Sequence, residues 1–190
     1  MKRTYMVIDV ACGRFPKHFD DWTPEERMLK PIPVYAIAFS CPIVGTVTHL
    51  PFDPDANADD YVLVIEKDEE WDTSLLTIFY EALRTVDCIV AHNAETDLWL
   101  LDQTHRQVFG EPWHYAGDFY CTMKEGLIYS RCHIYRGGKL VPKWPHLQAL
   151  CATLLDVGRV SKGDIVDDVL QCHFCASVMI DRQALAPAVQ

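Results

Sequence analysis

The sequence predicts an α/β domain in which a mixed β-sheet is flanked by helices. Apolar, β-branched segments dominate the early part of the chain, and later segments with helical spacing of apolar residues alternate with short apolar ones. Strands that come first and then alternate with helices favour a sheet covered by helices. The 190 residues, 49% of them hydrophobic, suffice for one such domain with a sizeable core.

The expected strands are short segments rich in β-branched and apolar residues. They span residues 4–10, 32–40, 43–49, 61–65 and 88–91, and a further strand-like piece opens the segment 118–129, which continues as helix. We expect the third strand to pair with the second. A polar, Pro-containing excursion over 14–30 and a loop over 53–60 separate these elements.

The expected helices have apolar residues at helical spacing. They span residues 74–86, 95–109, 146–156 and 165–181, and Thr73 or Ser74 is the expected N-cap of the first. The segment 131–145, with Gly137-Gly138 and two prolines, is predicted to be a loop. We expect residues 1–182 to form a single domain and residues 183–190 to form a frayed tail.

Composition excludes several classes of protein. Seventeen Lys and Arg against 27 Asp and Glu give a net charge of −10, which excludes a protein that coats long nucleic acid by charge alone. No apolar run approaches the roughly 18 residues of a membrane span, and Asp9 interrupts the first, so neither a membrane segment nor a signal peptide is expected. Several of the eight Cys lie inside apolar runs, which favours reduced thiols and a cytoplasmic location.

Three aspartates lie in apolar surroundings. Asp9 ends the first expected strand, Asp97 opens a helix after the strand 88–91, and Asp168 lies among apolar residues of the last helix. An isolated buried carboxylate is costly, so these side chains suggest pairing or a cation such as Mg²⁺ or Mn²⁺, one ion or two. Each also has a structural alternative: a turn at Asp9, the helix dipole at Asp97 and a solvated helix face at Asp168.

At this point five segments resemble the ordered motifs of the DnaQ-like DEDD 3′–5′ exonucleases, DEDDh branch. The segments are YMVIDVACGRF, DCIVAHNAETDLWLL, CTM, KWPHLQALCATLL and DIVDDVLQC. The resemblance covers about residues 4–180. It implies an RNase H-like fold and metal-dependent hydrolysis at the 3′ ends of short or single-stranded DNA or RNA.

The resemblance also assigns a degenerate metal site. Asp9, Asp97 and Asp168 match the family's aspartates and are implied as catalytic metal ligands, whereas Ala11 stands at the family's Glu position and Gly163 at its His position. The Glu holds metal and the His acts as general base in the family. Ala11 fits either a natural loss or an introduced substitution. A catalytically inactive relative that binds nucleic acid, a nucleotide or a protein partner through the same pocket is the alternative reading.

The resemblance further implies a pocket for the 3′-terminal nucleotide. The residues that would line it follow the first motif or belong to the second; they are Cys12, Gly13, Arg14, Phe15, His92 and Asn93. Phe15 is expected either to stack on a base or to pack on the core. His92 is expected either to hydrogen-bond a phosphate or sugar or to cap the following helix.

Charge is distributed unevenly. Residues 119–163 contain seven Lys and Arg and two acids, a net +5, and aromatic residues are interleaved among the cations. Arg136, Lys139 and Lys143, with Tyr135 and Trp144 beside them, predict an interface for a short single strand, with a solvated loop as the alternative. The acidic segment 53–72 suggests a third function, a protein-interaction module.

Overall fold

The computed structural model describes residues 3–15, 23, 31–40, 43–45, 62–130, 132–158, 160 and 163–185. The predicted loop over 53–60 and most of the predicted excursion over 14–30 lie outside these residues. The last helix continues through Leu185, so residues 183–185 of the predicted tail are helical, and residues 186–190 lie outside the described residues. No helix in the described part of the chain is long and apolar enough to cross a membrane.

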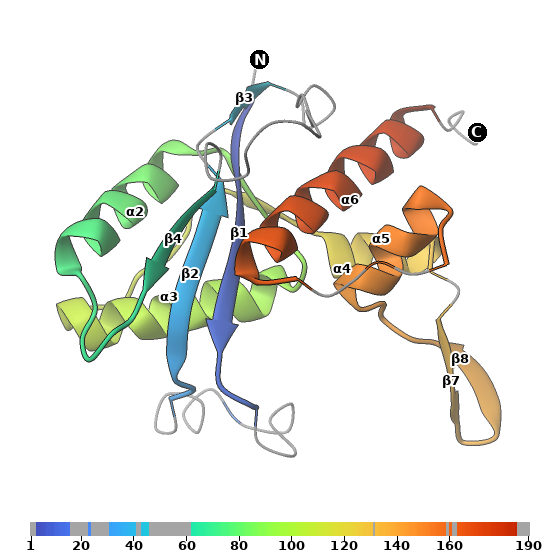
Figure 1. The fold of residues 1–190 in the computed structure, drawn as a ribbon, viewed down its shortest axis with the longest axis horizontal. Coiled ribbons are helices and arrows are strands. Elements are labelled where there is room, and N and C mark those ends of the chain that lie inside the picture. The colour runs from blue at the N-terminus through green and yellow to red at the C-terminus, as the bar shows by residue number, and fades with distance from the viewer. Residues whose placement is uncertain are drawn as a thin grey trace.

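A mixed sheet forms the centre of the fold (Figure 1). In order across the sheet, its main strands are β4 (Val62–Glu66), β2 (Val34–Ser40), β1 (Arg3–Cys12), β5 (Cys88–Ala91) and β6 (Asp118–Cys121). The pairs β4–β2 and β2–β1 are antiparallel, whereas β1–β5 and β5–β6 are parallel. The expected α/β class is confirmed.

The short strand β3 (Ile43–Gly45) pairs with β1, not with β2 as predicted. β2 pairs with β1 from Ile8 onward, which leaves the first residues of β1 with an open edge on the same side. The chain that leaves β2 at Ser40 reaches this edge at once, and Ile43 pairs with Tyr5. Exposed backbone donors and acceptors at a strand edge favour such pairing.

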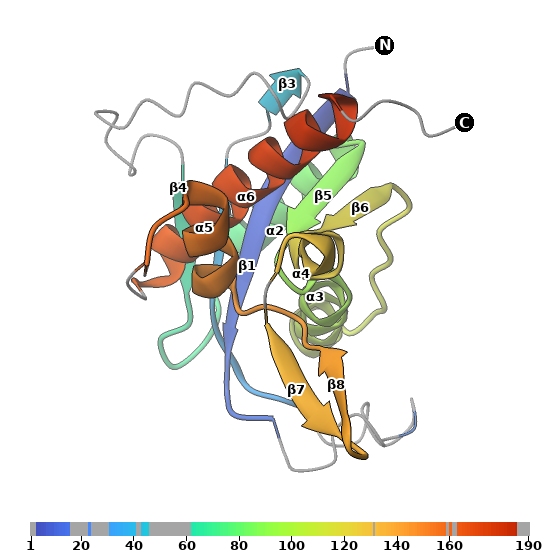
Figure 2. The same cartoon turned by 90° about the vertical axis from the view of Figure 1, so that its right-hand side faces the viewer.

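Helices cover both faces of the sheet (Figures 1 and 2). They are α2 (Thr73–Thr85) and α3 (Ala94–Phe109) on one face, α5 (Leu147–Leu155) and α6 (Ile165–Leu185) on the other, and the short α4 (Thr122–Glu125) followed by a 3₁₀ turn (Gly126–Ile128). Side chains of β1 alternate between the two cores, because successive residues of a strand point to opposite faces. Met6 and Ile8 pack with α2 and α3, whereas Tyr5 and Val7 pack with α5 and α6.

The first turn of α2 is capped by Asp72, not by Thr73 or Ser74 as predicted. The Asp72 carboxylate accepts hydrogen bonds from the backbone N–H groups of Ser74 (2.9 Å) and Leu75 (3.1 Å). An Asp oxygen satisfies the free N–H groups of a first turn well, and its negative charge interacts favourably with the helix dipole. The helix therefore begins at Thr73.

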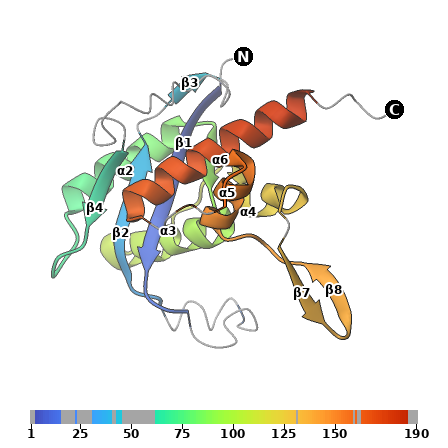
Figure 3. The same cartoon turned by 45° about the vertical axis from the view of Figure 1, so that its right-hand side comes forward.

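The segment 131–145 contains a β-hairpin where a loop was predicted. Strands β7 (His133–Arg136) and β8 (Lys139–Pro142) pair around Gly137 and Gly138, whose φ angles are 58° and 77°. Two central residues with positive φ are typical of the tight type I′ turn, for which glycine is well suited. The hairpin projects from the body of the protein (Figure 3). Its strands therefore lack the alternation of buried and exposed residues that identifies a strand in sequence.

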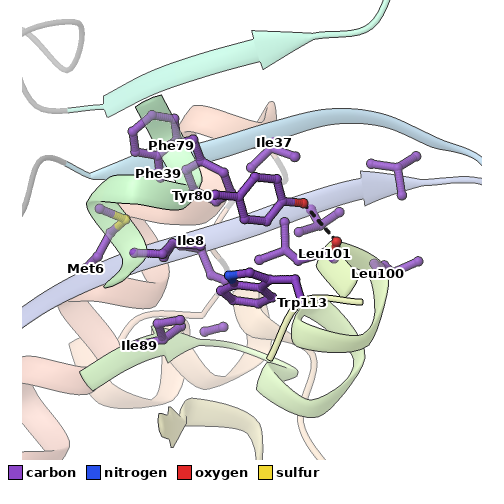
Figure 4. Packing of buried hydrophobic residues seen from close by; sticks show 14 of the residues in the cluster. Met6, Ile8, Ile37, Phe39, Phe79, Tyr80, Ile89, Leu100, Leu101 and Trp113 are labelled. Carbon is purple, nitrogen blue, oxygen red and sulfur yellow. Dashed lines mark hydrogen bonds between the residues drawn. The ribbon is translucent and has the colours of Figure 1, made fainter. Parts of the chain in front are cut away.

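Replacing Tyr80 with Phe is expected to lower the free energy of unfolding by about 1 kcal/mol. Tyr80 is buried among aromatic rings of the first core, and its hydroxyl donates a hydrogen bond of 2.8 Å to the Leu101 carbonyl (Figure 4). Urea denaturation with an unchanged m-value measures the loss. In contrast, Tyr135→Phe on the exposed hairpin is expected to stay within about 0.5 kcal/mol of the parent protein.

Candidate functional site

Asp9 and Asp97 come together at the carboxyl ends of β1 and β5. Asp9 follows Tyr5 and Val7 at two-residue intervals in β1, so it points to the face that α6 covers. Asp97 lies in the first turn of α3, which begins just after β5, and its side chain is buried. Burial, and next the charge of Asp9, raise the pKa of Asp97 well above its usual range. The two carboxyl groups therefore interact as like charges in a poorly solvated place.

Asp168 lies in the first turn of α6, the helix that covers the same face of the sheet. Its carboxylate accepts a hydrogen bond of 2.9 Å from the Gln148 amide of α5. One turn further along α6, the pKa of the Cys172 thiol is raised well above its usual value by burial and also by the charges of Asp9 and Asp97. This stretch of α6 therefore faces the acid pair.

The three aspartates do not form a ready metal cluster. Within the described ranges, no group of three or more His, Cys, Asp or Glu side chains is arranged to hold a metal ion. Asp9 and Asp97 are brought together, while Asp168 is engaged by Gln148. Of the three predicted ligands, the structure brings Asp9 and Asp97 together, whereas Asp168 lies on α6.

The residues after Asp9 line the end of β1. Burial, Asp97 and Asp9 together raise the pKa of the Cys12 thiol to about 11, so this thiol is neutral near pH 7. The Gly13 N–H donates to the Pro33 carbonyl (2.8 Å), which fixes the chain as it leaves the sheet. Arg14 is exposed, and Phe15 is half-buried against the first core. The core-packing alternative therefore describes Phe15 in this structure.

His92 joins three segments of the chain. Its Nε2 lies 3.0 Å from the Pro145 carbonyl and its Nδ1 lies 2.9 Å from the Thr122 hydroxyl. Burial lowers the pKa of His92 to about 4, against a smaller opposite effect of the Pro145 hydrogen bond. In the neutral ring, Nε2–H donates to Pro145 and Nδ1 accepts from Thr122. Both ring nitrogens therefore hydrogen-bond within the protein. In this structure His92 links Thr122 to Pro145, and its ring is not available for the predicted hydrogen bond to a phosphate or sugar.

The other predicted role of His92, capping α3, falls to its neighbour Asn93. Asn93 occupies the N-cap position of α3, where its side chain makes no capping hydrogen bond. Its backbone carbonyl accepts hydrogen bonds from the N–H groups of Thr96 (2.8 Å) and Asp97 (3.1 Å). The half-buried Asn93 amide thus lies one turn before Asp97, at the start of the same helix.

The N-terminus of α6 is closed by a reciprocal cap. The Asp164 carboxylate accepts from the N–H groups of Val166 (2.9 Å) and Asp167 (3.1 Å), and the Asp167 carboxylate accepts from the Asp164 N–H (3.3 Å). A Cβ atom added at Gly163 would lie 1.6 Å from the Asp167 Oδ2 atom. In this arrangement position 163 has no room for the His of the resembled family. The Asp-x-x-Asp spacing, typical of a capping box, is the sequence signal that was missed.

The basic hairpin is attached beside this region. The Lys143 N–H donates to the Cys132 carbonyl (2.9 Å) and closes the base of the hairpin. Two residues later, the Pro145 carbonyl meets His92, which directly follows β5. Arg136, Lys139 and Lys143 are exposed.

Acid is expected to destabilise the protein between pH 6.5 and about 4. Burial lowers the pKa values of His92 and His173 from 6.5 to about 4, so the unfolded chain binds these protons first as the pH falls. Each His costs up to about 3 kcal/mol of unfolding free energy across this window. In His173→Phe, chemical denaturation is expected to show a smaller loss from pH 6.5 to 4. Above pH 7.5, where His173 is neutral in the folded and the unfolded state, any change in the variant's unfolding free energy reports on packing alone. If the variant lost as much unfolding free energy between pH 6.5 and 4 as the parent chain, the lowered pKa of His173 would be contradicted.

Comparison with known proteins bears on the fold. No family model matches the chain, and no curated protein matches it. Among solved structures, the chain is similar to one described as "ExoI/SSB-Ct complex", with a TM-score of 0.59 and 12% identity over 97% of this chain and 42% of that chain. The fold is RNase H-like. The similarity confirms the predicted architecture and shows a distant likeness to the fold of an exonuclease. The protein spans less than half the length of that solved chain.

Proposed function

We propose that the protein is a 3′–5′ exonuclease-type phosphodiesterase that acts with a divalent metal on the 3′ ends of short or single-stranded DNA or RNA. The observation that carries this proposal is the pair formed by the half-buried Asp9 and the buried Asp97 at the carboxyl ends of parallel strands. Sites in α/β sheets gather at such strand ends. The exonuclease-like fold of the structural neighbour adds support for nuclease chemistry.

The donor chemistry of the acid pair fits one hard cation. Mg²⁺ is commonly held by one or two carboxylates, with waters and substrate phosphates completing its coordination. Two like charges with little solvent around them are stabilised by such an ion. Asp9 and Asp97 would hold it, and Asp168 is the third candidate ligand. When bound, the ion polarises a phosphoryl oxygen and lowers the pKa of a bound water.

The chain's own residues would place the 3′ end against this pair. The exposed Arg14 follows the end of β1 and suits a phosphate, and the Asn93 amide at the start of α3 suits a sugar or base. Cys12 and Gly13 follow Asp9 in the chain, and the neutral Cys12 thiol adds no charge there. His92 holds the end of β5 to the segment before α5 and keeps this edge in place.

A second candidate function is an inactive relative that binds nucleic acid, a nucleotide or a protein through the same pocket. Ala11 removes one acidic ligand, and Gly163 with Asp167 leaves no general base at the family's His position. Asp164 does not replace it freely, because its carboxylate caps α6. A cytoplasmic location and a protein partner stay predictions.

The two candidates differ in turnover. A 3′-labelled single strand, as DNA or as RNA, would be incubated with the full chain and Mn²⁺ or Mg²⁺, with EDTA as control. The proposal expects immediate release of labelled mononucleotide with metal, and a ladder shortened stepwise when the label is at the 5′ end. Binding without release under either metal favours the inactive relative.

A further inference from the structure

The β7–β8 hairpin is a largely exposed part of the protein surface. All its strand positions are exposed except the half-buried Val141. A two-stranded hairpin alone gains little stability in water. Three of its strand residues and one residue beside it are large, apolar and exposed: Ile134 (41%), Tyr135 (79%), Leu140 (57%) and Trp144 (55%).

Among the residues that the structure describes, Arg136, Lys139 and Lys143 take part in none of the ion pairs. Arg136 and Lys139 stand directly opposite one another across the strands, an arrangement in which like charges destabilise the pair. Lys143 follows β8 at the hairpin base. No Asp or Glu occurs in the sequence between Glu125 and Asp156. The repulsion would be relieved by a bound polyanion.

Aromatic side chains accompany these cations. Tyr135 precedes Arg136 on β7, and Trp144 follows Lys143 at the base. Cations that track phosphates, combined with open aromatic faces on which bases stack, are the two components of single-strand binding surfaces. An acidic peptide would use the cations but would leave the aromatic faces without planar partners. The combination therefore favours a single-stranded polynucleotide.

The base of the hairpin lies beside the carboxyl end of β5. It is closed by the Lys143–Cys132 hydrogen bond and tied through Pro145 to His92, at the end of β5. The same strand end leads into α3, whose first turn carries Asp97. The hairpin thus extends outward from the edge that holds the acid pair (Figures 2 and 3).

We propose that the β7–β8 hairpin is an arm that binds a single-stranded polynucleotide upstream of the end held at the acid pair. The direction of the strand rests on the proposed function, whereas binding by the arm needs no metal. Each four-residue strand is about 13 Å long, enough to contact several nucleotides of a single-stranded polynucleotide. We therefore expect polynucleotides that extend from the acid pair onto the hairpin to bind more tightly than oligonucleotides that are too short to reach it.

Fluorescence anisotropy in EDTA tests the arm separately from hydrolysis. The probes are 5′-labelled oligothymidine and oligouridine of about 4 and about 20 nucleotides. The full chain is expected to bind the longer probes at least about tenfold more tightly. In the triple variant R136Q/K139Q/K143Q, the slope of log affinity against log salt falls by about 2, since each phosphate contact contributes about 0.7. Lys67→Gln, an exposed cation beyond β4, is the matched control and keeps the full slope.

Two further variants separate loss of binding from loss of structure. Y135A/W144A keeps every charge and is expected to weaken long-strand binding at least about tenfold with an unchanged salt slope. Replacing residues 133–142 with Asn-Gly removes the arm above the Lys143–Cys132 hydrogen bond, and thermal melting confirms that the body stays folded.

The outcomes distinguish the arm from the proposed catalytic function. Long-strand binding that survives removal of the arm overturns this inference, even if the chain releases nucleotides. Tight, hairpin-dependent binding without hydrolysis under any metal supports the arm and rejects the exonuclease. Equal binding of polyglutamate and oligouridine, both insensitive to Y135A/W144A, also overturns it, because charge alone would then explain the surface.

Discussion

Asp97→Asn is expected to reduce Mn²⁺ affinity at least about 100-fold and to abolish metal-dependent release of nucleotides. Loss of a second-sphere group already costs about 10- to 100-fold in metal affinity, and Asp97 is proposed to contact the ion directly. The acid pair adds a distinctive effect on stability. Because Asp9 and Asp97 repel each other, the variant is expected to melt at a higher temperature than the parent chain in EDTA.

Bound metal is expected to reverse the order of the two melting temperatures, so that the parent chain melts above Asp97→Asn. An ion at 100 times its Kd stabilises the folded protein by about 2.7 kcal/mol, so saturating Mn²⁺ raises the melting temperature of the parent chain but not that of the variant. Asp181→Asn, an exposed acid of α6, is the matched control and keeps the response to Mn²⁺. Calorimetry of Mn²⁺ binding provides the affinity. Equal stabilisation of parent and Asp97→Asn by Mn²⁺ would reject a metal site at this pair.

Ala11→Glu is expected to produce the largest increase in metal affinity and in nucleotide release. Position 11 lies two residues after Asp9 on β1, so the new carboxylate points to the same face of the sheet. The residue paired with it across β2 is the small Ala36, which leaves space beside position 11. A further carboxylate strengthens binding of a divalent cation, and we expect Mn²⁺ affinity to rise at least about tenfold, with faster release of 3′ nucleotides.

Ala11→Gln separates charge from shape in this experiment. It has nearly the same size as Ala11→Glu but lacks the carboxylate, so it should leave Mn²⁺ affinity close to that of the parent chain. Release of nucleotides by Ala11→Glu but not by Ala11→Gln would support the exonuclease reading with position 11 as the limiting defect. If Ala11→Glu binds Mn²⁺ but hydrolyses nothing, the inactive relative is the better description.

The predictable parts of the fold are those in which burial imposes a pattern. β1, α2 and α3 alternate or repeat their apolar residues because each has a buried face, and the sequence predicts all three. The β7–β8 hairpin has no buried face, so its strands carry no such pattern, although Gly137-Gly138 identifies its turn. The pairing of β3 was missed for another reason, since an open strand edge is a property of the assembled sheet.

The sequence identifies candidate acids, but it does not determine how their side chains are arranged. The apolar surroundings of Asp9 and Asp97 indicate buried acids, and the structure places the two together. Nothing in the sequence distinguishes Asp168, engaged by Gln148, from an acid that joins them. Likewise, the neutral state of His92 follows from Thr122 and Pro145, which are distant along the chain.

The cap of α6 bears on how this site can change during evolution. With Asp167 filling the space beside Gly163, a histidine introduced at position 163 meets a carboxylate before it reaches any substrate. Removing Asp167 first would take away one half of the cap and weaken the start of α6. A histidine at position 163 and the present cap therefore exclude each other, so placing a histidine base there requires a paired change at position 167.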